Sequence, residues 1–257
     1  MQSLGFAAQS VAGRVRGHNE DAVLCLPALG LWAVADGMGG HQCGEVASAL
    51  ALDSLRRAIE AGSGLEDAIH AAHQAILDAL QEEDGRPMGS TVVAARFADE
   101  GFEVAWIGDS RAYHVSLDGI ARLTRDHSWV QAMIDAGELS PEEARRHPRR
   151  NIVTQCLGQG GQALEVGRVQ GCLAPGELLL LCSDGLTGEL NDEQIQAVCA
   201  EAATLDALVE ELIALANQLG GRDNISCIVL GRSMAESTEI DARPRHFLSR
   251  WLQSRKS

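Results

Sequence analysis

Four aspartates occur where the sequence predicts that strands end. They are Asp21 in NEDA, Asp36 in ADGMGG, Asp184 in SDGL and Asp223 in RDNI, and three of them adjoin a run of four or more apolar residues. Such a run is typical of a buried strand, so a carboxylate at its end is expected to face a cleft beside the core. A single aspartate in this setting is ordinarily a turn former. Four of them, joined by Asp109 in IGDSR, predict a carboxylate cluster.

Carboxylates gathered in one cleft repel each other, and hard divalent cations are the simplest neutraliser. Oxygen-only ligation suits magnesium or manganese, whereas the sequence has no Cys/His spacing typical of structural zinc. Two metals about 3.5–4 Å apart can activate a water and align it with a phosphorus atom. Arg16, upstream of Asn19-Glu20-Asp21, is suited to bind the phosphoryl oxygens, although an ordinary surface arginine is equally compatible with the residues alone.

Apolar runs separated by turn residues predict an α+β protein. Helical spacing is expected over 45–61, 65–80, 192–202 and 205–219. Strands are expected over 6–15, 22–26, 31–35, 90–97, 102–107, 112–115, 120–123, 164–170, 178–182 and 225–230. The glycine-rich segment 36–40 is expected to break regular structure, and 128–160 to form a polar, mobile insertion with one or two short helices. Without regular βαβ alternation, a layered arrangement is favoured over a doubly wound sheet.

Composition bounds the class of protein. Of the 257 residues, 46% are hydrophobic but only 4% are aromatic, which predicts a sizeable core of aliphatic side chains. A net charge of −15 disfavours nucleic-acid binding, because a polyanion would be repelled. The seven scattered cysteines lack a CxxC pair and favour reduced thiols in the cytoplasm. Neither a signal peptide nor an apolar run of about 20 residues is visible, so no membrane segment is expected.

The C-terminal residues differ from the rest. Residues 232–257 hold six basic and three acidic side chains, so this tail is positive while the remainder of the chain is strongly negative. We expect a catalytic domain over 1–231 and a flexible basic tail over 232–257. The stretch 245–255 could alternatively form a basic amphipathic helix that docks on a membrane or a partner.

Seven motifs in order resemble the metal-dependent protein phosphatases of type 2C (the PPM family) in their compact bacterial, stand-alone form. The motifs run from GRVRGHNEDA at 13–22 and VADGMGGHQCGE at 34–45 through GST at 89–91, GDSRAY at 108–113, LTRDHS at 123–128, CSDGL at 182–186 and DNIS at 223–226. The resemblance implies a four-layer αββα sandwich in which paired helices flank two antiparallel sheets. It also implies that the insertion 128–160 is a flap beside the active site.

The resemblance further implies roles for individual residues. Asp36 would bridge two Mn²⁺ or Mg²⁺ ions, with the Gly37 carbonyl as a ligand to one of them. Asp184 and Asp223 would complete the first site, with Asn224 in support. Asp21 would act through water near the second ion with support from Glu20. Two further roles follow: Asp109 and Asp184 would hold a possible third ion, and Arg16 would bind the substrate phosphate.

The expected reaction is hydrolysis of phosphoserine and phosphothreonine by a hydroxide bridging the metals, without a phosphoenzyme. Relatives from higher organisms carry a histidine where this chain has Met38, so His41 becomes the candidate general acid, with a turn-capping role as the alternative. Cys182 lacks the C-x5-R loop of cysteine phosphatases, because Thr187 stands where the arginine would be. We therefore expect Cys182 to be a core residue.

Two other classes of function stay open at this point. A pseudophosphatase would bind phosphoproteins without cleaving them, but such chains usually lose metal aspartates that this one retains. A phosphatase of small metabolites would need a nucleotide- or sugar-binding loop, and none is recognisable. The expected partners are phosphorylated proteins, among them a cognate serine/threonine kinase and its substrates. We expect a cytoplasmic monomer that binds no nucleic acid and has no integral membrane segment.

Overall fold

The computed structural model describes residues 4–39, 43–82, 87–98, 101–116, 118–161 and 163–232. The strands are β1 (Leu4–Val11), β2 (Asp21–Leu26), β3 (Leu31–Gly39), β4 (Met88–Ser90), β5 (Val92–Ala98), β6 (Gly101–Ile107), β7 (Arg111–Ser116), β8 (Gly119–Arg122), β9 (Gly167–Cys172), β10 (Leu178–Cys182) and β11 (Ile225–Arg232). The α-helices are α1 (Cys43–Glu60), α2 (Leu65–Glu82), α3 (Trp129–Asp135), α4 (Pro141–Arg146), α5 (Asp184–Thr187), α6 (Asp192–Glu201) and α7 (Leu205–Leu219). A short 3₁₀ helix, η1 (Pro27–Leu29), joins β2 to β3.

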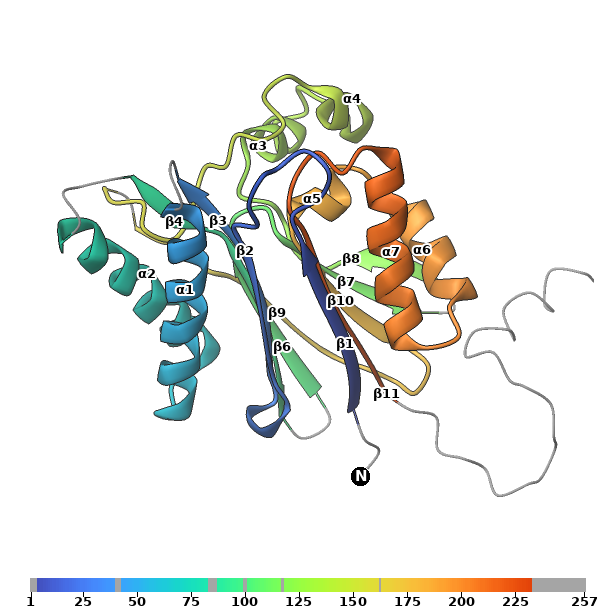
Figure 1. The fold of residues 1–257 in the computed structure, drawn as a ribbon, viewed down its shortest axis with the longest axis horizontal. Coiled ribbons are helices and arrows are strands. Elements are labelled where there is room, and N and C mark those ends of the chain that lie inside the picture. The colour runs from blue at the N-terminus through green and yellow to red at the C-terminus, as the bar shows by residue number, and fades with distance from the viewer. Residues whose placement is uncertain are drawn as a thin grey trace, which may run out of the picture.

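The strands form two antiparallel sheets that lie face to face (Figure 1). One sheet has the order β1-β11-β10-β7-β8, and the other has the order β2-β3-β5-β6-β9, with β4 paired to the end of β3. Helices α1 and α2 cover the outer face of the second sheet, and α6 and α7 cover the outer face of the first (Figure 1). The expected four-layer αββα sandwich is confirmed.

Strand alternation divides the apolar side chains among three cores. Along β3, Leu31, Ala33 and Ala35 pack toward α1 and α2, whereas Trp32 and Val34 pack between the sheets. Successive side chains of a strand point to opposite faces, so Asp36 must continue the row that faces the other sheet. This parity directs the first of the predicted carboxylates into the space between the sheets.

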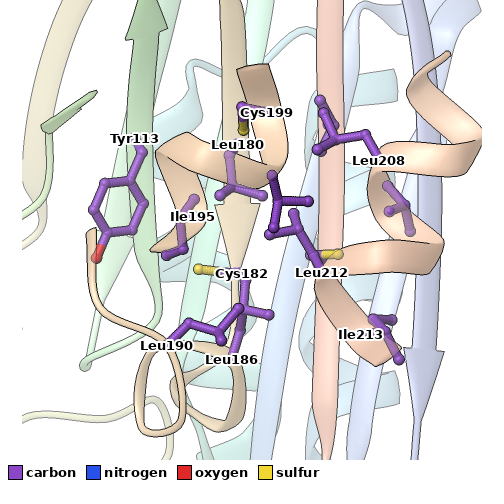
Figure 2. Close-up of a cluster of buried hydrophobic side chains, with 14 of the residues drawn as sticks. Tyr113, Leu180, Cys182, Leu186, Leu190, Ile195, Cys199, Leu208, Leu212 and Ile213 are labelled. Carbon is purple, nitrogen blue, oxygen red and sulfur yellow. The ribbon is translucent and has the colours of Figure 1, made fainter. Parts of the chain in front are cut away.

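The third core lies between the first sheet and its helices (Figure 2). Cys182 on β10 is fully buried there with Tyr113, Leu186 and Leu212. Burial raises the pKa of the Cys182 thiol to about 12, so the thiol stays protonated and is a poor nucleophile. The expectation that Cys182 is a core residue is confirmed.

Most predicted elements are present, but the expectation for 36–40 was wrong as far as the described residues go. β3 continues as a strand to Gly39, because Met88–Ser90 lies alongside it as β4 and supplies backbone partners. These glycines permit close approach rather than a turn: a Cβ on Gly37 would lie 1.9 Å from the Gly44 carbonyl oxygen. The first strand is shorter than predicted, because the chain leaves the sheet after Val11 to form the loop that carries Arg16.

One or two short helices were expected in the insertion at 128–160. The structure has two, α3 and α4, which lie at the same end of the sandwich as α5 (Figure 1). Ser128 caps α3, and Ser140 forms a capping box with Glu143 at the start of α4. Within the described residues, none of the helices combines the length and apolar character that crossing a bilayer requires. His41 lies outside the described residues, and so does the predicted tail beyond Arg232.

Candidate functional site

Asp21 and Asp36 lie opposite each other in the antiparallel pair β2–β3. Directly opposed residues of such a pair point to the same face, so both carboxylates face the space between the sheets. The same register places Glu20 next to the end of β3, where the Glu20 carbonyl oxygen accepts hydrogen bonds from the Gly37 amide (3.1 Å) and the Ser48 hydroxyl (2.6 Å). Local strand pairing thus joins four of the predicted site residues.

Asp21 is tied to the opposite sheet by two serines. Its Oδ2 accepts hydrogen bonds from Ser183 Oγ (2.8 Å), at the end of β10, and from Ser226 Oγ (2.6 Å), on β11. Its Oδ1 is buried and has no hydrogen-bond partner among the described residues. A buried carboxylate oxygen without a partner is costly, so Oδ1 is a ready acceptor for a cation or for a water bound to one.

Asp36 and Asp184 meet across the two sheets. Asp184 is the first residue of α5, which starts where β10 ends. The Asp36 carboxyl hydrogen-bonds Asp184, which opposes the rise that burial imposes on the pKa of Asp184. The Asp36 backbone is held in turn by Thr91, whose hydroxyl lies 3.1 Å from the Asp36 amide nitrogen and whose amide nitrogen lies 2.8 Å from the Asp36 carbonyl oxygen.

Asp223 precedes β11 and forms an ion pair with Arg16 at 2.8 Å. Arg16 is half-exposed, so its guanidinium is accessible from solvent. The loop that carries it is anchored by Asn224, whose Oδ1 accepts from the Glu20 amide (2.8 Å) and whose Nδ2 donates to the His18 carbonyl oxygen (2.8 Å). Through both atoms of its side-chain amide, Asn224 therefore links the start of β11 to the loop that contains Arg16 and Glu20.

Asp109 lies in the tight connection between β6 and β7 and is buried. Gly108 adopts a positive φ of 101° there and packs against Thr91. Arg111, two residues after Asp109, donates hydrogen bonds to both carboxylate oxygens of Asp126, with the closest contact at 2.7 Å. This bidentate pair connects β7 to the segment that leads into α3, and therefore joins the Asp109 loop to the insertion.

Mutual repulsion and burial shape the electrostatics of the cluster. Burial raises the pKa of Asp36 well above its usual range, and the charges of Asp21, Asp184, Asp109 and Asp223 add to the rise. Asp109 is shifted in the same direction by burial and by Asp184, while Arg111 opposes the shift. Burial raises the pKa of Asp21 to about 7, against the hydrogen bonds from Ser226 and Ser183. Carboxylates in such a cluster cannot all ionise without repelling one another. A bound cation would reduce this repulsion and favour their charged forms.

The donor set fits hard divalent cations. The groups that could ligate a cation are carboxylates, hydroxyls and backbone carbonyls, and Asp21 Oδ1 has no hydrogen-bond partner among the described residues. Among the described residues, however, no group of three or more His, Cys, Asp or Glu side chains is already arranged to hold one ion. Asp223 is engaged by Arg16 and Asp21 by its two serines. Arg16 contacts only Oδ2 of Asp223, so a cation bound at that oxygen would displace Arg16.

The structure brings the predicted residues to one end of the sandwich. Direct contacts or electrostatic coupling connect Asp21, Asp36, Asp109, Asp184 and Asp223, together with Arg16, Glu20, Gly37 and Asn224. Ser183 and Ser226 were not predicted as site residues, although they belong to the CSDGL and DNIS motifs. The alternation of side chains along the strand could have placed Ser226. It shares a face of β11 with Ile228 and Leu230, which point toward the other sheet.

Comparisons with known proteins agree with this geometry. The family described as Protein phosphatase 2C matches residues 14–228. A serine/threonine phosphatase, stp, from Listeria innocua is 36% identical over 238 residues, which cover 87% of this chain and 94% of that protein. The crystal structure of the serine/threonine phosphatase PstP/Ppp from Mycobacterium tuberculosis superposes with a TM-score of 0.82 at 34% identity, over 90% of this chain and 99% of that one.

A further solved structure is the catalytic domain of a serine/threonine protein phosphatase PstP in complex with two manganese ions. It has a TM-score of 0.78 and 32% identity, and the match covers 90% of this chain and 99% of that one. The family match extends from the Arg16 loop to β11 and therefore includes all five aspartates. Together with the shared two-sheet architecture, it shows that this chain belongs to the protein phosphatase 2C family.

Proposed function

We propose that this chain is a metal-dependent phosphatase that removes phosphate from serine and threonine residues of proteins. The observation that carries the proposal is the convergence of five carboxylates and one half-exposed arginine at the end of the β-sandwich. Family membership supports the reaction class, and the relatives named above are serine/threonine phosphatases. The manganese-bound relative supports Mn²⁺ as a cofactor, with Mg²⁺ as the alternative.

Asp36, Asp184 and Asp223 are the residues that we assign to one cation, and Asp36 with the Gly37 carbonyl to a second. Asp21 and Glu20 would hold water around the second cation, and Asp109 with Asp184 would hold a third. When bound, these ions supply Lewis acidity and an activated water for attack on phosphorus. The register of β2 with β3 holds Asp21 opposite Asp36, so the protein sets the spacing of its carboxylates through backbone hydrogen bonds.

Arg16 is the group that we assign to the phosphate of the substrate. Its guanidinium is half-exposed and already binds a carboxylate, Asp223, which shows that it can reach an anion at this position. A planar guanidinium can donate two parallel hydrogen bonds to phosphoryl oxygens. Release from Asp223 when a cation binds there would free Arg16 for the substrate, so cation binding and phosphate binding are coupled.

A phosphoenzyme route through cysteine is disfavoured by burial. The Cys182 thiol, although only two residues from Asp184, faces the core between β10 and the helices and has a raised pKa (Figure 2). A direct attack of water on phosphorus needs no protein nucleophile. His41 stays the candidate general acid from the sequence alone, because it lies outside the described residues.

The test compares hydrolysis of a phosphothreonine peptide with and without Mn²⁺ for the wild type, Asp36→Asn and Asp184→Asn. We expect both variants to lose Mn²⁺-dependent kcat/KM by at least about a hundredfold, because Lewis-acid catalysis contributes several kcal/mol. Asp53→Asn is the matched control, since Asp53 lies on α1 and pairs with Arg56 and Arg57. Full activity in Asp36→Asn, or none in the wild type with Mn²⁺, would refute the proposal.

The same measurements separate the other two functions. A phosphoprotein-binding pseudophosphatase would retain the peptide without releasing phosphate, and a metabolite phosphatase would prefer a nucleotide monophosphate to the peptide. As biological substrates we propose a cognate serine/threonine kinase and the proteins that it phosphorylates. We further propose a cytoplasmic monomer whose catalytic domain spans 1–231 and is followed by a separate basic tail.

A further inference from the structure

A hollow of about 390 Å³ extends from the carboxylate cluster toward the insertion. Its lining includes Asp109 and Asp184 of the cluster and Val130 and Ile134 of α3. The hollow is therefore continuous with the candidate active site and is bounded on another side by the insertion. Its volume lies in the range of pockets that hold small molecules or side chains, about 300–1,000 Å³.

Arginines distinguish this hollow from the carboxylate cluster. Arg111 and Arg122 both pair with one carboxylate, Asp126, at 2.7 and 3.7 Å, and the charge of Arg111 also acts on Asp109 and Asp184. Arg145 donates to the Leu190 carbonyl oxygen (3.1 Å), which leaves its charge without an acidic partner among the described residues.

Arg150 extends the same positive lining. Its guanidinium has neither an ion pair nor a hydrogen bond within the part of the chain that the structure describes, and its side chain is exposed. Besides Asp109 and Asp184, the acidic groups of the lining are Asp126 and Asp192. Cations bound by the cluster would neutralise Asp109 and Asp184, so the four arginines would then exceed the remaining acids by two charges. The region beside the reacting phosphate would attract an anion.

We propose that this hollow binds an anionic side chain of the substrate protein next to the phosphorylated residue, with Arg145 and Arg150 as the groups that recognise it. The ligand chemistry is a carboxylate or a second phosphate, since a guanidinium binds either in a bidentate manner. The proposal rests on the proposed phosphatase function and adds a preference for substrates that are acidic, or phosphorylated twice, near the site of cleavage.

A matched control lies on the same helix. Arg145 and Arg150 also line an adjoining hollow of about 700 Å³, in which Arg146 is found as well. Arg146 pairs with Glu142 at 3.4 Å, is largely exposed and does not line the first hollow. Substitution of Arg146 therefore removes the same charge from α4 without removing a group from the proposed subsite.

The experiment measures kcat/KM with Mn²⁺ on three phosphothreonine peptides that differ at the flanking positions: neutral glutamines, glutamates, or a second phosphothreonine. It compares the wild type with Arg150→Gln, the double variant Arg145→Gln/Arg150→Gln, and Arg146→Gln. Ratios between peptides cancel any general loss of activity or of folded protein. The single Arg150→Gln variant keeps the test valid if the double variant, which also loses the bond to Leu190, fails to fold.

For the wild type we expect the anionic peptides to exceed the neutral peptide by about fivefold, because two exposed ion pairs at about 0.5 kcal/mol each contribute about 1 kcal/mol together. The ratio should approach one in the double variant and stay at the wild-type value in Arg146→Gln. If only the doubly phosphorylated peptide gains, the ligand is a phosphate; if both gain, a carboxylate suffices.

Equal rates on all three peptides, or a preference that survives in the double variant, would overturn the subsite while leaving the phosphatase proposal intact. Absence of turnover on every peptide would instead refute the proposed function, and the subsite with it.

Discussion

Asn224 offers a sharp test of how the site is held together, because one side chain anchors the loop that carries Arg16. Its Oδ1 accepts from the Glu20 amide at 2.8 Å, and its Nδ2 donates to the carbonyl oxygens of Ala12 (3.1 Å) and His18 (2.8 Å). The side chain is 6% exposed, so water cannot readily replace these bonds. Asn224→Ala would leave one amide and two carbonyl groups without their partners.

The expected loss follows from these three bonds. Each neutral hydrogen bond contributes about 1 kcal/mol, and a partner left buried and unsatisfied can cost more, so we expect a decrease of about 3 kcal/mol in the free energy of unfolding. For a domain of this size, that corresponds to a decrease in Tm of about 6–12 °C. The loop would also hold Arg16 and Glu20 less firmly, so KM for a phosphopeptide should rise more than kcat falls.

The assay is urea unfolding of the metal-free protein together with phosphopeptide kinetics. Thr204→Ala is the control, because Thr204 only caps α7 and its loss should cost about 1 kcal/mol without changing KM. Asn224→Asp should give an intermediate loss of stability, since it keeps the acceptor for Glu20 but removes both donors. If Asn224→Ala loses no more stability than Thr204→Ala and KM is unchanged, the loop is not held by this side chain.

Three further outcomes can be measured. Arg16→Ala should raise KM for a phosphopeptide by about tenfold or more, because a charged hydrogen bond contributes about 1.5–3 kcal/mol; an unchanged KM would contradict the assignment. The pKa of Asp21 is about 7 in the folded protein against an ordinary value of 3.8, so the protonated form favours folding; this stability is fully present below about pH 4 and is lost as the pH rises to about 7. The Tm of the metal-free protein should therefore fall between about pH 4 and 7 and recover with Mn²⁺, and a pH-independent difference between the two would argue against the buried cluster. Gly37→Ala should abolish activity and destabilise the fold, since its methyl would lie 1.9 Å from the Gly44 carbonyl oxygen, whereas Gly64→Ala, which meets only a side-chain oxygen at 3.9 Å, should be tolerated.

Local patterns predicted the elements well where the side chains repeat with a clear period. Helix α7 matches the predicted range from Leu205 to Leu219, because its apolar stripe is regular and Thr204 caps its first turn. The prediction failed at 36–40, where glycines in sequence suggest a turn. β3 persists to Gly39 because β4, about 50 residues later in the chain, supplies its hydrogen bonds. No local propensity contains that information.

The candidate site likewise has features that the sequence predicted and features that only the folded structure reveals. The types and contexts of the five aspartates, and the position of Arg16 before one of them, could be recognised from the residues and from the motifs that resemble the family. The pairing of Asp21 with Ser183 and Ser226 could not, because it depends on the separation of the two sheets. The ion pair between Arg16 and Asp223 was also unforeseen, since those residues are 207 positions apart.

The sequence by itself determined which chemistry is available: oxygen ligands for hard cations, an arginine for phosphate, and no C-x5-R motif at Cys182 for covalent catalysis. Tertiary structure alone decided the electrostatic state of that chemistry. Stacking two sheets brings carboxylates from distant loops into one poorly solvated space, where burial and their neighbouring charges raise their pKa values. Spacing along a chain cannot set such energies, because they depend on distances through space and on the exclusion of water.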